Sequence, residues 1–158
     1  MKRRMAIRSA LLSLVTVAVL AGSVLATASS GFVSVLQSRG SLSESLQFNT
    51  GAVKFQTKGS VDVATAVVTI APGGFSGWHE HPGIVLLTVK SGTVTFYDQT
   101  CVGTAHPAGT SFVEANGDGP GIARNESTSV DAVVNVTYIV PTGAALRIDT
   151  PIAPCVLP

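Results

Sequence analysis

The sequence predicts an all-β domain, an antiparallel sandwich or barrel, on three observations. From position 53 onward, short runs rich in Val, Thr, Ile, Phe and Tyr recur at close spacing, among them VDVATAVVTI and VDAVVNVTYIV. Gly- and Pro-rich segments such as APGG, KSG and NGDGPG separate these runs and supply the backbone angles that turns require. After the first 28 residues, no window of about eleven residues carries a helical stripe of apolar side chains.

The first 28 residues have the layout of a secretory signal peptide. Basic residues precede an almost uninterrupted apolar run from Ala10 to Ala26, and the small residues 26–28 follow as a cleavage site. An uncleaved membrane anchor is the alternative, because the apolar run approaches the ~20 residues that span a bilayer. We expect cleavage after Ala28, a secreted or extracytoplasmic protein, and no membrane association of the mature chain.

Removal of this segment changes the charge and the domain count. Four of the ten basic residues and none of the nine acidic ones lie in it, so six basic residues remain against nine acidic ones, a net charge of −3. No basic stripe remains, and we therefore expect no nucleic-acid partner. The remaining chain suits one domain with its own core. We expect an N-terminal extension at 29–52, in which 41–48 form a helical turn or nothing regular, and a β domain at 53–158.

Both cysteines, Cys101 and Cys155, lie in the exported part of the chain. In an oxidising compartment an even, isolated pair most simply forms one disulfide. The bridge would close a loop of more than fifty residues, which is worth about 4 kcal/mol in the chain-entropy model. A metal-binding or redox pair is the alternative, but the two cysteines do not have the close CxxC spacing of such sites.

The run IVLLTVKSGTVTFYD, residues 84–98, predicts a β-hairpin. Gly92 can take the left-handed backbone conformation that a tight hairpin turn demands. In the first half of the run Val85, Leu87 and Val89 share one face, and the other face is also largely apolar. This pattern predicts a central strand buried on both sides or a strand of a two-layer sheet.

Two of the three histidines, His79 and His81, are one residue apart in a segment that reads as extended. Because side chains alternate along a strand, both imidazoles point to one face while Glu80 points to the other. Such a pair can present two nitrogen ligands to one divalent metal ion. The alternative is a pair of polar side chains that line a pocket without binding metal.

Two longer segments carry a family resemblance. GWHEHPGIVLLTVKSG (77–92) resembles the first motif of the cupin superfamily, and AGTSFVEANGDGPGIARNES (108–127) resembles the second. From about residue 61 to 155 the chain is similar to small secreted bacterial cupin-domain proteins, which share GWHxHPG, SGTxTxYD, ARNE and a terminal RIDxP. The resemblance implies a single jelly-roll barrel of six to eight strands with the HxH pair facing its mouth. A homodimer is also compatible with it.

The metal site that the resemblance implies is incomplete in this chain. His79 and His81 match the first two ligand positions of the family. Val85 stands where the family has a Glu, and Gly121 stands where it has a third His. Three other residues could supply the missing ligands: His106, Glu114 and Asp118.

Two functions follow from this pattern. The first is an exported barrel that binds an apolar or sugar-like small molecule in its mouth, with a weak two-histidine metal site or none. The second is a metal-dependent enzyme of the oxygenase, isomerase or lyase type, in which Fe, Mn, Ni or Zn is bound by His79 and His81, with His106 as a candidate further ligand. A structural envelope protein is a third class, supported only by the export signal. The architecture hosts many chemistries and does not specify the substrate.

Overall fold

The computed structural model describes residues 27–115, 117 and 119–150 of the chain. Twelve strands and no helix occur in these residues, which confirms the all-β class. Most of the predicted signal peptide and residues 151–158, with Cys155, lie outside the described residues, so its cleavage and the disulfide to Cys101 stay predictions. Within the described part of the chain, no helix has the length and hydropathy needed to cross a membrane.

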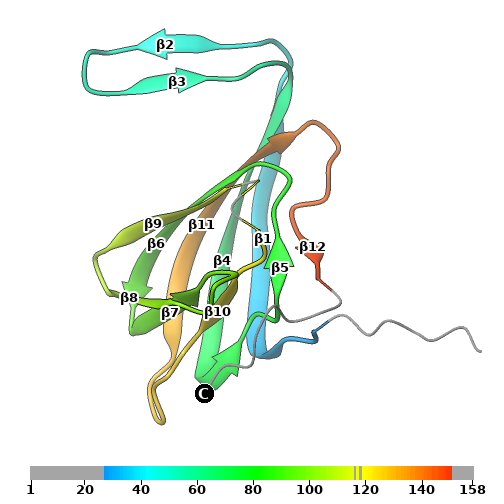
Figure 1. Cartoon of the computed structure of the whole chain (residues 1–158). Helices are drawn as coiled ribbons and strands as arrows, with labels where there is room; N and C mark the ends of the chain where they lie inside the picture. Colours follow the sequence, from blue (N-terminus) through cyan, green and yellow to red (C-terminus); the bar gives the residue numbers. More distant parts are fainter. Residues whose placement is uncertain (1–26, 116, 118, 151–158) are drawn as a thin grey trace, which may run out of the picture.

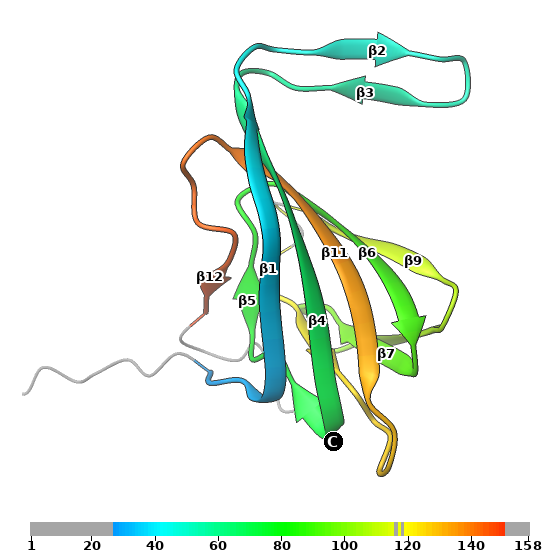
Figure 2. The same cartoon turned by 180° about the vertical axis from the view of Figure 1, so that it is seen from behind.

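The strands form two curved layers of a nearly closed jelly-roll barrel, seen from opposite sides in Figure 1 and Figure 2. The first sheet contains, in spatial order, β1 (Ser30–Leu42), β4 (Val61–Phe75), β11 (Ala132–Pro141), β6 (Ile84–Ser91) and β9 (Ser111–Ala115). The second contains β12 (Ile148–Asp149), β5 (His79–Glu80), β10 (Ile122–Arg124), β7 (Thr93–Tyr97) and β8 (Gly103–Pro107). A separate hairpin, β2 (Gln47–Asn49) with β3 (Lys54–Gln56), projects from one end. The single jelly-roll barrel is thereby confirmed.

Alternation along the long strands builds the core between the two sheets. In β4, every second residue from Asp62 to Ile70 is buried, and the residues between them face the outer surface. The β-branched side chains that fill β4 and β11 fit such a pleated, half-buried surface. The inward-facing residues of the first sheet include Ala64, Ala66, Val68, Ile70, Val85, Leu87, Val89, Val134, Val136 and Val140.

Across four neighbouring strands of the first sheet, the register aligns these inward residues in rungs. The first rung consists of Ala64, Tyr138, Val85 and Glu114. The second rung, two residues away on each strand, consists of Ala66, Val136, Leu87 and Phe112. Directly opposed residues of antiparallel strands point to the same face with their Cβ atoms about 4.5–5.5 Å apart. The side chains of one rung therefore reach the same level of the barrel interior.

The hairpin predicted at Ser91 and Gly92 is wrong. Strand β6 pairs with β11 and β9, whereas β7 pairs with β10 and β8. Gly92, with φ of +73°, is a corner at which the chain passes from one sheet to the other. A Cβ atom on Gly92 would lie 2.5 Å from the carbonyl oxygen of Asp131, so the corner needs glycine for space as well as for its backbone angle.

The segment 29–52, which the sequence suggests as an N-terminal extension, contributes the full-length edge strand β1 to the barrel. Residues 41–48 contain no helical turn. Arg39 and Ser41 hold this strand to β4 through hydrogen bonds to the Asp62 carboxylate of 2.6–2.8 Å. The Ser41 hydrogen bond, then those from Gly143 and Arg39, lower the pKa of Asp62 to about 2. A buried carboxylate thus anchors β1, whose own side chains are mostly exposed.

Candidate metal centre

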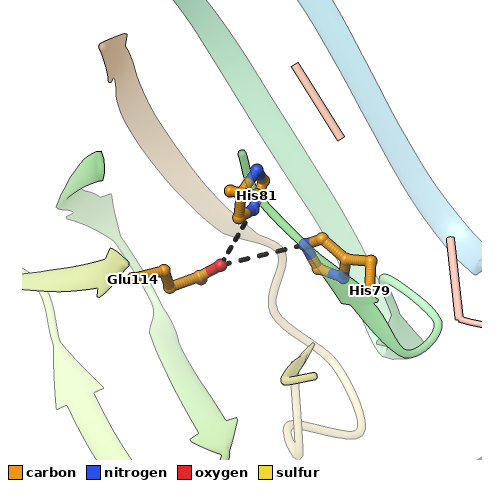
Figure 3. Close-up of side chains that lie close together, drawn as sticks. All are labelled: His79, His81 and Glu114. Carbon is orange, nitrogen blue, oxygen red and sulfur yellow. Dashed lines mark ion pairs between the residues drawn. The ribbon is translucent and has the colours of Figure 1, made fainter. Parts of the chain in front are cut away.

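Three side chains with metal-ligating atoms meet at the inner face of the barrel: His79 in β5, His81 just beyond it and Glu114 in β9 (Figure 3). One ligand atom from each lies within 4.8 Å of the others. The Nε2 atom of His81 is 3.0 Å from Oε2 of Glu114, and the Nε2 atom of His79 is 3.8 Å from the same oxygen. All three side chains are buried.

The backbone around β5 fixes the direction of both imidazoles. The amide of His79 donates to the carbonyl oxygen of Gly121 at 3.0 Å, and the amide of Gly121 donates back at 2.9 Å. On its other edge β5 pairs with β12. Within this paired segment the side chains alternate, so His79 and His81 face inward while Glu80 is exposed.

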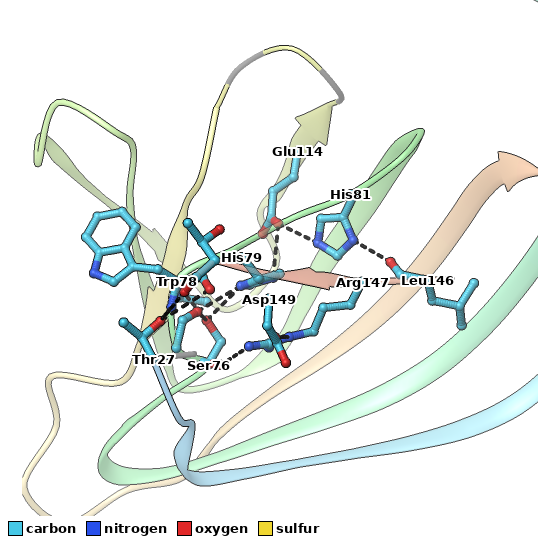
Figure 4. A network of polar contacts seen from close by, with 12 residues as sticks. Thr27, Ser76, Trp78, His79, His81, Glu114, Leu146, Arg147 and Asp149 are labelled. Carbon is cyan, nitrogen blue, oxygen red and sulfur yellow. Dashed lines mark hydrogen bonds and ion pairs between the residues drawn. The ribbon is translucent and has the colours of Figure 1, made fainter. Parts of the chain in front are cut away.

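Hydrogen bonds to carbonyl oxygens fix the orientation of both rings (Figure 4). Nδ1 of His79 lies 2.9 Å from the carbonyl oxygen of Gly77, and Nδ1 of His81 lies 2.6 Å from that of Leu146. Because a carbonyl oxygen only accepts, each Nδ1 donates a proton to it, and each Nε2 is the ring nitrogen that faces Glu114. Burial lowers the pKa of His79 to about 4, against the opposing effect of Glu114, so this ring is neutral at neutral pH.

These three residues fit a first-row divalent metal ion. Metal–nitrogen and metal–oxygen bonds of about 2.0–2.2 Å place neighbouring ligand atoms roughly 3–3.5 Å apart around one ion. The separations of 3.0 and 3.8 Å to Glu114 lie close to that range, and the widest separation in the cluster, within 4.8 Å, would shorten around an ion. Two imidazoles and one carboxylate suit Fe, Zn and similar ions, and leave further coordination positions open. The donor set does not distinguish between these metals.

The carboxylate of this cluster comes from a different strand than the resemblance implies. Val85, which stands at the usual Glu position, is fully buried and directly faces Glu114 across the β6–β9 pairing. Because opposed side chains share one face, a carboxylate on β9 reaches the level that a carboxylate at position 85 would reach. The sequence names Glu114 only as one of several candidates, since the strand register that brings it opposite Val85 has no local signal.

The ring of Phe96 fills the space beside Gly121, the position at which the resemblance implies a third histidine. Gly121 bridges to His79, and a Cβ atom on Gly121 would lie 2.2 Å from the tip of the Phe96 ring. Phe96 and Gly121 line a small pocket of about 30 Å³ against the two histidines and Glu114. The family position is therefore filled by a ring from β7, and glycine at 121 makes room for it.

The remaining candidate ligands lie elsewhere or outside the described residues. His106, in β8, stacks on Phe112 with ring centroids 4.0 Å apart, and it is not among the three clustered ligand residues. Burial lowers the pKa of His106. Asp118 lies outside the described residues. Of the three additional candidates, only Glu114 joins the histidines in the described structure.

A cavity of about 190 Å³ opens beside the three clustered residues, between the two sheets. Its walls are mostly the apolar side chains of the core. Four further polar residues line it, none of which the sequence singled out as a candidate: Ser34, Ser76, Tyr138 and Arg147. Alternation along β11 could have shown that Tyr138 faces inward. Arg147 is the first residue of the RIDxP motif, which marks the family resemblance but indicates no contact with the cavity. Burial, with a smaller contribution from Glu114, raises the pKa of Tyr138, which keeps its hydroxyl protonated.

No protein-family model matches this sequence, and no curated protein matches it. Solved structures with a similar fold include a cupin domain from Bordetella pertussis Tohama I, at 17% identity over 69% of this chain and 93% of that one, with a TM-score of 0.47. An RmlC-like cupin protein from Desulfovibrio desulfuricans matches at 21% identity over 70% and 82%, also with a TM-score of 0.47. The strand order of the barrel is that of a jelly-roll fold, the kind of barrel that the sequence resemblance to cupins implied, and the histidine pair at β5 faces its interior.

Proposed function

We propose that this protein binds one divalent metal ion through His79, His81 and Glu114 and uses it to bind and activate a small organic molecule in the adjoining cavity. The signal-peptide layout of the first 28 residues supports an exported location for this activity. The proposal makes the site a three-ligand centre, in place of the two-histidine site that the sequence suggested.

One observation carries the proposal. Both imidazoles donate their Nδ1 protons to backbone carbonyl oxygens, and both therefore direct Nε2 toward a single buried carboxylate oxygen. Metal-binding histidines are oriented by hydrogen bonds of this kind. Polar side chains that merely line a pocket do not require such an arrangement.

The side chains that line the cavity suit it to a small organic molecule. The apolar walls exclude water around the centre, which strengthens electrostatic interactions inside it. Tyr138, whose ring lies 5.7 Å from that of His81, offers a protonated hydroxyl as a hydrogen-bond donor. An ion held by His79, His81 and Glu114 would supply Lewis acidity next to the cavity.

Metal analysis of untagged protein purified without chelator tests this function. We expect about one Fe, Mn, Ni or Zn ion per chain, either as purified or after incubation with each metal. His79→Ala should lose the ion because one of only three protein ligands is removed. His106→Gln is the matched control, since His106 is the remaining histidine and stacks outside the cluster.

Two results would contradict the proposal. The first is a wild-type protein that takes up none of these ions. The second is an equal loss of metal in His79→Ala and His106→Gln. Either result would favour the metal-free binding barrel, because the apolar cavity could hold a guest without an ion.

A further inference from the structure

We propose that the guest of the cavity is a small carboxylate with a compact apolar body, held with its carboxylate toward Arg147 and the metal centre. This inference rests on the proposed function, because it assigns the class of molecule that the same site receives. It combines the size of the cavity, the position of its charged groups and the chemistry of its two ends.

The size of the cavity limits the guest to roughly one ring with a short substituent. The cavity has a volume of about 190 Å³, and an apolar protein cavity of about 150 Å³ accommodates benzene. The second rung and the rung beyond it, Val68 with Val134 and Val89, present only aliphatic and aromatic groups to this space. A polar or charged body would lose its hydration there without gaining hydrogen bonds.

Arg147 lies at the polar end of the cavity, near the two histidines (Figure 4). Its guanidinium donates to the carbonyl oxygen of Ser76 at 2.6 Å and forms an ion pair with Asp149. These contacts fix the group beside the centre, where its charge helps lower the pKa of His79 and opposes the rise in that of Tyr138. Asp149 is about half exposed, so the anion that pairs with Arg147 is partly screened by water.

The charges at this end favour an anionic guest. Two neutral imidazoles and one carboxylate leave a divalent ion with one unit of positive charge uncompensated. Arg147 adds a second positive charge to the cavity wall, and among the described lining residues Glu114 is the only acidic one. A guest carboxylate would neutralise the excess charge of the ion and share Arg147 with the half-exposed Asp149, whereas a neutral guest would leave the charge of the ion uncompensated in apolar surroundings.

Isothermal titration of Zn²⁺-loaded protein with four small probes tests the inference. Benzoate carries both the anion and the ring, benzyl alcohol lacks the charge, benzylamine reverses it, and acetate lacks the body. We expect benzoate to bind at least about tenfold more tightly than each of the other three. Benzyl alcohol or benzylamine binding as tightly as benzoate would overturn the anionic head group, and acetate binding as tightly would overturn the apolar body.

Two variants separate the head group from the body. Arg147→Met should weaken benzoate at least about tenfold while Zn²⁺ affinity is retained, because Arg147 is not a metal ligand. Ala66→Leu, which fills the second rung, should weaken benzoate but leave acetate unchanged. Circular dichroism of each variant establishes that the barrel is folded, and unchanged benzoate affinity in a folded Arg147→Met protein would overturn the role of Arg147.

Failure of this inference is distinguishable from failure of the proposed function. If Zn²⁺ does not bind, the metal centre itself is wrong, whatever the probes do. If one Zn²⁺ binds through the three ligands and benzoate shows no preference over benzyl alcohol, the centre stands and the carboxylate class is wrong.

Discussion

The first and second rungs of the barrel are built by the same four strands, yet they present different chemistry to the cavity. The first rung carries Tyr138 and Glu114 next to the two histidines, and the second, two residues away, is wholly apolar. Both are largely buried. The difference shows that on this barrel the choice of side chain at one level of the register decides between a polar centre and a dry binding space.

The largest effect should follow from placing a charge in the wrong rung. Leu87→Glu puts a carboxylate into the second rung, where no metal or cation can pair with it, and should lower the free energy of unfolding by about 3–5 kcal/mol. Thr88→Glu is the matched control, because Thr88 is the next residue along β6 and its side chain faces solvent. Urea unfolding measures both variants, and equal stability would show that the second rung is not the dry layer described.

Acid should weaken the metal-free protein through His79, which lies next to the first rung. The pKa of His79 is lowered from 6.5 to about 4 in the folded chain, so the unfolded state binds more protons between these values. Stability is therefore complete above about pH 6.5 and is lost as the pH falls toward 4, by about 2 kcal/mol at pH 5.

Unfolding at pH 7 and pH 5 in the presence of chelator measures this loss, and His79→Gln should show a smaller one. Asp62, with a pKa of about 2, does not change its charge in this window. An identical loss in the wild type and in His79→Gln would contradict the buried neutral imidazole.

A smaller effect should follow from adding one methyl group beside the centre. Gly121→Ala should cost about 1 kcal/mol, because its Cβ meets the tip of the Phe96 ring and the ring must shift. Gly40→Ala is the control, since no atom lies within 4 Å of its Cβ position. Thermal unfolding compares the two, and Phe96→Leu combined with Gly121→Ala should recover part of the loss.

The smallest change is expected when the carboxylate moves within the first rung. The double variant Val85→Glu/Glu114→Val should keep Zn²⁺ affinity within about tenfold of the wild type, because both positions point to one level of the interior. Leu87→Glu/Glu114→Val moves the carboxylate to the second rung and should abolish binding. Competition with a chromophoric chelator measures both, and similar affinities would remove the distinction between the rungs.

The sequence predicts the parts of this structure that depend on local pattern. Alternation and turn residues predict the strands β4, β6, β7 and β11, and the HxH spacing predicts that His79 and His81 share a face. Residues that depend on long-range register were harder to place. Glu114 reaches the histidines only because β9 pairs with β6, and Gly92 serves as a corner between sheets because β6 and β7 have other partners.

Strand β1 shows a second limit of pattern-based prediction. Most of its side chains are exposed, so the segment lacks the alternation that marks a half-buried strand. Its place in the sheet is set by backbone pairing with β4 and by the hydrogen bonds of Asp62. Neither contact leaves a local signal in the sequence.

The most direct test of the three-ligand centre compares two glutamates near the histidines. Glu114 lies in the first rung, 3.0 Å from His81, whereas Glu80 stands between the two histidines and is exposed on the opposite face. The account predicts that Glu114→Gln raises the dissociation constant for Zn²⁺ by at least about 100-fold and that Glu80→Gln leaves it unchanged. Equal dissociation constants for the two variants would contradict the centre.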